Sequence, residues 1–173
     1  MSVVPGDPAS LSACAATARA IGSRLGRRAT GVRTASRLVA QGWTGRASAA
    51  VRRRASRLAE ATDTTATELD RVGRVLQDHA SDLADLVARG RRLQERAREA
   101  GLEVRDGRVE LAWGVRGTAD AASDRQREQA QVALQADLDL VVAQHRRRRD
   151  WMLGVLREST TTLSQASHDL RGG

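Results

Sequence analysis

The sequence contains no lysine, asparagine, phenylalanine or tyrosine, and Ile21 is its only isoleucine. The codons of these residues are rich in A and T, whereas those of the abundant Arg, Ala and Gly are rich in G and C. The simplest explanation is a very GC-rich genome, as in actinobacteria. Arginine in place of lysine therefore reflects genome composition more than phosphate recognition.

Cysteine is nearly absent too, because Cys14 is the only one. A single cysteine excludes an intramolecular disulfide and a cysteine metal cluster. Since Cys14 falls on an apolar helical stripe, we expect a buried free thiol. No apolar run is long enough to span a bilayer. Residues 1–7 lack the basic-then-apolar order of a Sec signal peptide, so we expect a cytoplasmic protein whose export, if any, uses another route.

Acidic residues are missing from Pro8 to Ala59, and this makes the net charge of +8 uneven. Residues 1–59 carry eleven arginines less Asp7, a net +10. Residues 60–173 carry eighteen arginines less twenty acids, a net −2. The N-terminal third is therefore a strongly cationic module attached to a nearly neutral remainder.

What is present is helical periodicity, in a chain of 173 residues that is long enough to bury a core without disulfides or metal. Asp7-Pro8 is a good helix start. Apolar residues then recur at steps of three and four, broken only by Arg28, and predict a helix over 8–41. This stripe consists of Leu11, Cys14, Ala18, Ile21, Leu25, Val32, Ala35 and Val39.

A second, stronger pattern predicts a helix over 46–100 with a sustained heptad seam. Such a helix is about 80 Å long at 1.5 Å per residue, so it needs antiparallel partners to cover the seam. The seam runs from Val51 to Ala100, and its helix-packing residues include Leu58, Leu69, Val72, Leu76, Leu83 and Leu86.

Gly101 ends this helix, and Asp106-Gly107 between two alternating segments predicts a β-hairpin. A two-residue turn pairs Val104 with Val109 and Leu102 with Leu111 on one face. A lone hairpin is marginal in water, so we expect that face to pack on the helices, with Trp113.

A third helix is predicted from Thr118 to Asp169. Its seam runs from Ala130 to Met152, shifts register there and resumes at Leu156. The predicted fold is all-α, an elongated antiparallel three-helix bundle or coiled coil with a small β-hairpin between the second and third helices. One structural domain comprises a helical hairpin (1–100), a connector (101–117) and a third helix (118–173).

The tetrapeptide Gly42-Trp43-Thr44-Gly45 joins the first two predicted helices. Glycine permits turn conformations, so it predicts an interhelical elbow. In a chain without Phe or Tyr, the Trp43 indole is the largest group available to plug the end of a narrow helix pair. The alternative is that Trp43 serves recognition.

Trp43-Thr44-Gly45 between two helices resembles the WXG100 family of type VII (ESX-like) secretion substrates. The flanks are similar as well: Arg46-Ala47 leads into Ala49-Ala50-Val51, and Pro5-Gly6-Asp7-Pro8-Ala9 opens an Ala-rich helix. The likeness covers about residues 5–100; the hairpin and the third helix make the chain an extended relative. The resemblance implies a helical interaction protein, secreted by a type VII route. Because the family's Tyr-x-x-x-Asp/Glu tag is impossible without tyrosine, it also implies that a partner supplies the tag.

Two groups of arginines form a candidate patch for a polyanion or an acidic partner. The alternative is that these arginines form only a solvated helix face whose charge is partly neutralised by acids. Aromatic interleaving and helix-turn-helix spacing are absent, which favours an acidic protein over nucleic acid. The patch comprises Arg46, Arg52, Arg53, Arg54, Arg57, Arg146, Arg147, Arg148 and Arg149.

His79 and His145 fall on the seams of two antiparallel helices and are expected to be core or boundary residues. Two histidines without cysteine or carboxylate companions make a poor metal site. No Ser, His and Asp constellation appears, so we expect no enzyme, cofactor or small-molecule substrate. Gly22-Ser23-Arg24-Leu25-Gly26 has the spacing of closely packed helices.

The leading hypothesis is therefore a non-enzymatic protein that associates through its helices with another helical protein, WXG-like or effector, or with itself. It would be a type VII secretion substrate or a helper of one. The alternatives are a cytosolic basic coiled-coil protein that binds DNA or another polyanion, and a structural adaptor with no link to secretion.

Overall fold

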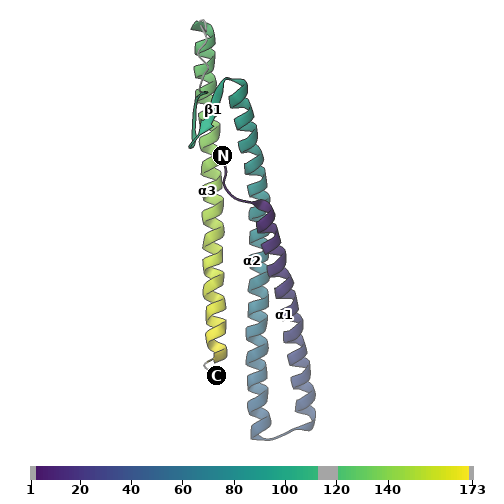
Figure 1. Cartoon of the computed structure of the whole chain (residues 1–173). Helices are drawn as coiled ribbons and strands as arrows, with labels where there is room; N and C mark the ends of the chain where they lie inside the picture. The colour runs from purple at the N-terminus through teal and green to yellow at the C-terminus, as the bar shows by residue number, and fades with distance from the viewer. Residues whose placement is uncertain (1–2, 113–120, 172–173) are drawn as a thin grey trace. The chain divides into compact units, whose positions relative to one another are not determined.

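The computed structural model describes residues 3–112 and 121–171, which form three long helices and one β-hairpin (Figure 1). The elements are α1 (Pro8–Gly42), α2 (Arg46–Glu99), β1 (Leu102–Arg105), β2 (Arg108–Leu111) and α3 (Ala121–Arg171). The prediction of a helical fold with a hairpin between the second and third helices is confirmed. Trp113 and the predicted start of the third helix at Thr118 lie outside the described residues.

The chain packs as two compact units. The elbow unit consists of Ala9–Asp78 and Trp151–Gly173, and the hairpin unit consists of Met1–Pro8 and His79–Asp150. α2 and α3 are each divided between the two units, with one segment in each. The predicted division into 1–100, 101–117 and 118–173 follows the order of the elements, whereas packing groups the middle of the chain with its first residues. Among the described helices, none has an apolar stretch suited to crossing a membrane.

In the hairpin unit, α2 and α3 pack through aliphatic seam residues. The N-terminal segment adds a strap across α2, in which Val4 is buried and Val3 lies against Gly90. Gly6 has a φ of +123°, and a Cβ there would lie 2.9 Å from Leu83 Cδ2. Glycine therefore permits both the turn into α1 and the close approach to α2. The buried seam residues are Leu83, Leu86, Leu93 and Ala97 of α2, with Leu134, Leu138 and Val141 of α3.

The hairpin has the predicted register, with Leu102 opposite Leu111 and Val104 opposite Val109. Asp106 and Gly107 have φ values of 49° and 78°, as a type I′ turn requires. Leu102 and Val109 are buried, but Leu111 is 58% exposed, so the prediction that the whole face packs on helices is wrong at Leu111.

The outer edge of β2 is closed by glutamine side chains of α3. The Val109 N–H donates to Gln135 Oε1, and Gln131 Nε2 donates to the Val109 carbonyl, both at 2.8 Å. These bonds satisfy backbone groups that an edge strand otherwise leaves to solvent. The spacing of the two glutamines, one helical turn apart, was the available sequence signal.

In the elbow unit, α1 packs on α2 through its smallest side chains. Ala15, Gly22 and Ala29 are the buried residues of α1, one heptad apart, and Ala59 and Gly73 are buried on α2. A Cβ at Gly22 would lie 2.8 Å from the Ala66 carbonyl oxygen. The predicted close packing of two soluble helices at Gly22 is confirmed.

This packing corrects the predicted α1 stripe by one position. Cys14 is exposed rather than buried, and Ile21 and Val39 are 38% and 45% exposed. The predicted stripe follows the larger apolar side chains of α1. The helices instead approach along the neighbouring line of Ala and Gly, where backbones come closest.

On the other side of α2, the elbow unit packs Val75 against Met152 and Val155 of α3. Ser159 is also buried, and its hydroxyl donates to Glu68 Oε1 at 2.5 Å. The α3 seam therefore continues at heptad steps through Met152, Val155, Ser159 and Ala166. The predicted register shift near Met152 is wrong, because Ser159 occupies a seam position and satisfies its hydroxyl on α2.

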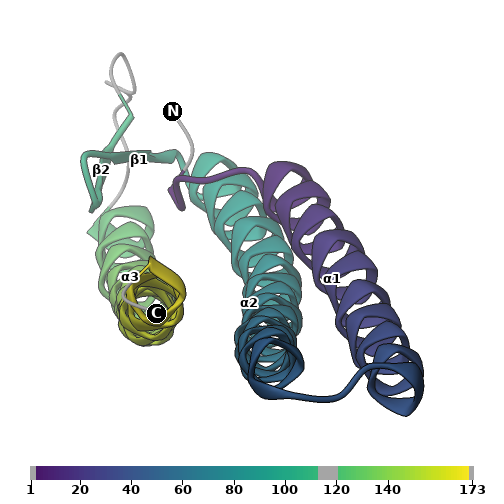
Figure 2. The same ribbon diagram turned by 90° about the horizontal axis from the view of Figure 1, so that it is seen from below.

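In both views α2 of the elbow unit lies between α1 and α3 (Figures 1 and 2). Gly73 lies on its side facing α1, with the buried Ala59 two heptads earlier on the same line, and Glu68 and Val75 lie on its side facing α3. α2 thus uses two contact lines, and the predicted seam runs between them.

Candidate interaction surface

The elbow between α1 and α2 is built by backbone groups, two glycines and one serine. Gly45 has a φ of +103°, and its carbonyl accepts the first hydrogen bond of α2 from the Ala49 N–H at 3.0 Å. A residue with a Cβ would be strained at this φ. Ser48 is fully buried, and its Oγ donates to the Trp43 carbonyl at 2.6 Å. The elbow predicted at Gly42, Trp43, Thr44 and Gly45 is present, and all four residues are exposed.

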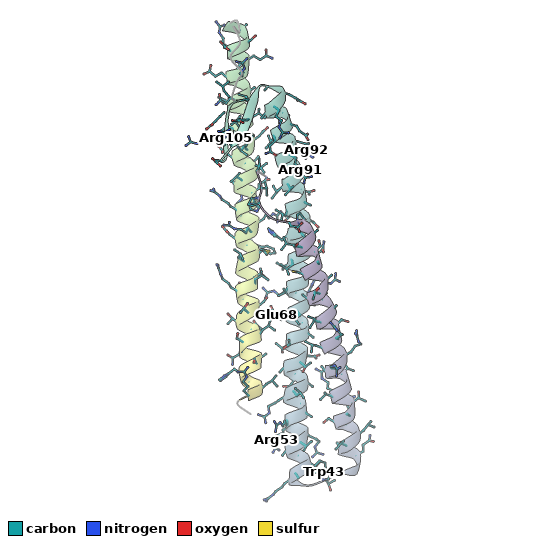
Figure 3. The ribbon with its side chains drawn as sticks, viewed as in Figure 1. Trp43, Arg53, Glu68, Arg91, Arg92 and Arg105 are labelled. Carbon is teal, nitrogen blue, oxygen red and sulfur yellow. The ribbon has the colours of Figure 1, made fainter. Side chains whose placement is uncertain are left out.

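The Trp43 side chain does not plug the helix pair. It is 41% exposed at the elbow tip (Figure 3), and the buried position beneath the turn is held by Ser48. The plug interpretation is therefore wrong.

The predicted packing seam of α2 differs in burial along its length. Leu83 and Leu86, in the hairpin unit, are buried. Leu69, Val72 and Leu76, in the elbow unit, are half-buried, since they lie between the two contact lines of α2. Leu58 is 44% exposed, whereas its neighbour Ala59 is buried.

The arginines of the predicted patch belong to different units. Arg46, Arg54 and Arg57 are exposed in the elbow unit, as is Arg53 (Figure 3), and Arg52 is half-buried. Arg146–Arg149 lie in the hairpin unit, all exposed.

The two groups also differ in their partners. Arg148 lies 3.3 Å from Asp82, and Arg149 lies 2.8 Å from Asp150. In the elbow unit, Arg19 pairs with Asp70 at 3.7 Å, and Arg33 pairs with Asp63. The other nine of the eleven arginines in residues 8–59 form no ion pair with a described carboxylate. Uncompensated positive charge is therefore concentrated on α1 and the first part of α2.

His79 and His145 are buried in the hairpin unit, at 5% and 9% exposure, as core histidines were expected to be. Burial lowers the pKa of His79; Asp82 opposes this shift and Arg148 adds to it. Burial also lowers the pKa of His145, with Arg149 and His79 adding to the effect and Asp150 opposing it. No group of three metal-ligating side chains occurs among the described residues.

Acid is expected to destabilise the hairpin unit through these two histidines. Their pKa values are lowered in the folded chain, whereas an unfolded histidine titrates at about 6.5. Below about 6.5 the unfolded chain therefore binds more protons, and stability falls with decreasing pH. The melting temperature should drop between pH of about 7.5 and about 5.5, and the drop should shrink in His79→Gln/His145→Gln. The variant His168→Gln, at an exposed position, is the control. If the melting temperature of the double variant drops as much as that of the parent, His79 and His145 do not cause the effect.

Three features stand out on the surface of the elbow unit. They are an exposed indole on a hydrogen-bonded turn, large aliphatic side chains on the outside of a small-residue helix pair, and arginines without an ion pair to a described carboxylate. Among the family models, curated proteins and solved structures compared with the chain, none matches it.

Proposed function

We propose that the protein is a non-enzymatic helical interaction protein that acts by helix–helix association, as a type VII secretion substrate or its helper. The observation that carries this proposal is the exposed Trp43 on an elbow whose geometry depends on Gly45 and Ser48. A large aromatic that the fold does not need for packing is available for a partner. This is the role that the resemblance to the WXG100 family implies for it.

The mechanism is burial of half-covered seams. Leu69, Val72 and Leu76 lie between two contact lines of α2 and retain accessible surface. A helix laid along them, from another helical protein or a second copy, would complete a bundle that the chain leaves open on this face. Since the chain has no tyrosine, a partner would also supply the tyrosine-containing export tag.

Trp43→Ala is expected to lower partner binding or export by at least about tenfold while leaving helicity unchanged, because the indole is exposed and hot-spot aromatics carry about 2 kcal/mol or more. Trp151→Ala is the matched control, since Trp151 is 54% exposed on α3 of the same unit. Circular dichroism and co-purification of the partner measure the two effects. Equal losses in both variants, or none in either, would remove the functional role of the elbow.

The export component is tested separately in the native host. Culture medium is compared between strains with and without the type VII secretion ATPase. The protein, or a partner that depends on it, should disappear from the medium of the second strain. Unchanged amounts in both media would leave a structural adaptor without a secretion link.

The alternative of a polyanion-binding protein has its own support in the nine arginines of residues 8–59 that form no ion pair with a carboxylate in the described part of the chain. Counterion release makes duplex binding fall steeply with salt. Tight, salt-dependent binding to arbitrary duplex DNA near physiological ionic strength would favour this function over helix association.

A further inference from the structure

The elbow end of the α1–α2 pair has its small residues inside and its large apolar residues outside. Gly22, Ala29, Ser48 and Ala59 are buried. The residues that remain 38% to 48% exposed include Ile21, Val39, Val51 and Leu58. A helix pair that needed these side chains for its own stability would turn them inward.

These large residues fall on a single face of the pair. On α1, Ile21 precedes the contact residue Gly22 by one position, and on α2, Leu58 precedes the contact residue Ala59 in the same way. Antiparallel helices are related by a local twofold axis perpendicular to their common plane. Equivalent positions on the two helices therefore share one face, which we call the open face: Ile21, Val32, Val39, Val51 and Leu58.

The open-face residues of α1 and those of α2 also lie level with each other along the helix pair. A Cβ at Gly22 would lie 3.3 Å from Leu69 Cβ, and Arg33 pairs with Asp63. Continued along antiparallel helices, this alignment sets Val32 level with Leu58 and Val39 level with Val51. Two rows of apolar side chains that lie level on adjacent helices form a groove in which a third helix can pack.

Arginines of α1 and the first part of α2 border the open face, and Asp63 and Asp70 of α2 pair with two of them, Arg33 and Arg19. Residues 8–59 contain eleven arginines and no acid, and nine of these arginines have no described carboxylate partner. A second copy would bring the same uncompensated charge against this border, so like-charge repulsion disfavours self-association here.

We propose that the open face binds an acidic amphipathic helix, with its apolar stripe on Ile21, Val39, Val51 and Leu58 and its carboxylates on the surrounding arginines. This inference rests on the proposed function and deepens it by naming the surface and the chemistry of the partner. A polyanion without apolar groups would satisfy the arginines but leave the stripe in water. A helix with apolar and acidic faces satisfies both.

The test uses the full chain and a synthetic probe, a peptide of about three heptads with leucine at a and d and glutamate at most other positions. A scrambled peptide of the same composition keeps the charge and loses the stripe. Phosphatidylglycerol vesicles and duplex DNA probe a lipid surface and a nucleic acid. Affinity is measured by the fluorescence anisotropy of labelled peptide or DNA, and vesicle binding by co-sedimentation.

Two pairs of variants locate the site. Leu58→Ser should weaken peptide binding about tenfold, since a buried leucine is lost from the interface. Leu140→Ser, which removes a 53% exposed leucine of the hairpin unit, should not change it. Arg52→Gln/Arg53→Gln/Arg54→Gln should weaken binding at low salt, and Arg146→Gln/Arg147→Gln/Arg149→Gln should have a smaller effect.

The proposal is overturned if the scrambled peptide binds as tightly as the amphipathic one, if Leu58→Ser and Leu140→Ser behave alike, or if DNA or vesicles bind more tightly than the peptide. A photo-crosslinking residue placed at Leu58 or at Leu140 in the native host then separates two kinds of failure. A partner captured at Leu140 alone would leave the proposed function intact and place its site elsewhere. A partner captured at neither position, with unchanged Trp43→Ala behaviour, would remove the proposed function itself.

Discussion

Gly22→Val is expected to lower the free energy of unfolding of the elbow unit by about 3 kcal/mol, the upper range for overpacking a well-packed contact. A Cβ at Gly22 would lie 2.8 Å from the Ala66 carbonyl oxygen and 3.3 Å from Leu69 Cβ. The first of these atoms belongs to the α2 backbone, which cannot turn aside as a flexible side chain can. Relief therefore requires α1 to move away from α2 along their shared contact line.

The same reasoning extends to Gly73, on the opposite helix. A Cβ there would lie 2.9 Å from the Ala15 carbonyl oxygen. Gly22 and Gly73 thus permit the close approach of the two backbones in the first half of α1. Since small residues continue the contact at Ala29 and Ala59, separation at Gly22 should propagate toward the elbow.

Gly31→Val is the matched control, because a Cβ at Gly31 meets nothing within 4 Å. Valine has a helix propensity a few tenths of a kcal/mol better than that of glycine, so this variant should be about as stable as the parent or slightly more so. Urea titration followed by circular dichroism measures both variants. Equal stabilities of Gly22→Val and Gly31→Val would show that α1 does not depend on close approach to α2.

The element boundaries of the fold were predictable because each is marked by local chemistry. Asp7-Pro8 and Gly45 precede helices, Gly101 has the positive φ of a helix-ending glycine, and Asp106-Gly107 forms the predicted turn. These signals act through the backbone of a few residues, so they hold whatever the tertiary contacts are.

The side of each helix that packs was less predictable, because size and burial disagree in this chain. The α1 stripe of large residues is half-buried or exposed, whereas Ala15, Gly22 and Ala29 make the contact. Close approach of two backbones gains contact along the whole line of small residues, and large residues on that line would prevent it. The sequence signal was the heptad spacing of small residues.

Only part of the candidate surface was predictable from the sequence. The elbow residues were found from their glycines, and the cationic region from its missing acids. The turn at Trp43 is closed by Ser48, whose hydroxyl donates to the Trp43 carbonyl. A serine two residues into a helix carries no sequence signal that distinguishes this use from an ordinary surface position.

Ser159→Ala is expected to destabilise the contact between α2 and α3 in the elbow unit by about 1–3 kcal/mol, because a buried acceptor loses its partner. Glu68 is 8% exposed and accepts from the Ser159 hydroxyl at 2.5 Å and from Arg71 at 3.1 Å (Figure 3). Removing the hydroxyl leaves one of these bonds. The variant Glu158→Gln serves as control: its ion pair with Arg71 is largely exposed and should be worth less than about 1 kcal/mol.

Combining Ser159→Ala with Glu68→Met should reverse most of that loss, although it removes two polar groups instead of one. Val75, Met152 and Val155 form an apolar cluster, in which Val75 lies two turns from Glu68 and Val155 lies one turn from Ser159, so methionine extends an existing core. Replacing a buried polar pair by apolar groups is often neutral or stabilising, because the cost of desolvating the carboxylate disappears.

A double-mutant cycle by urea titration measures the energetic coupling between Glu68 and Ser159. If Ser159→Ala costs the same with Glu68 as with methionine in its place, the two side chains are energetically independent. If they are coupled, the buried Glu68 specifies which α3 residue meets α2 at a continuing heptad seam, at a net cost in stability.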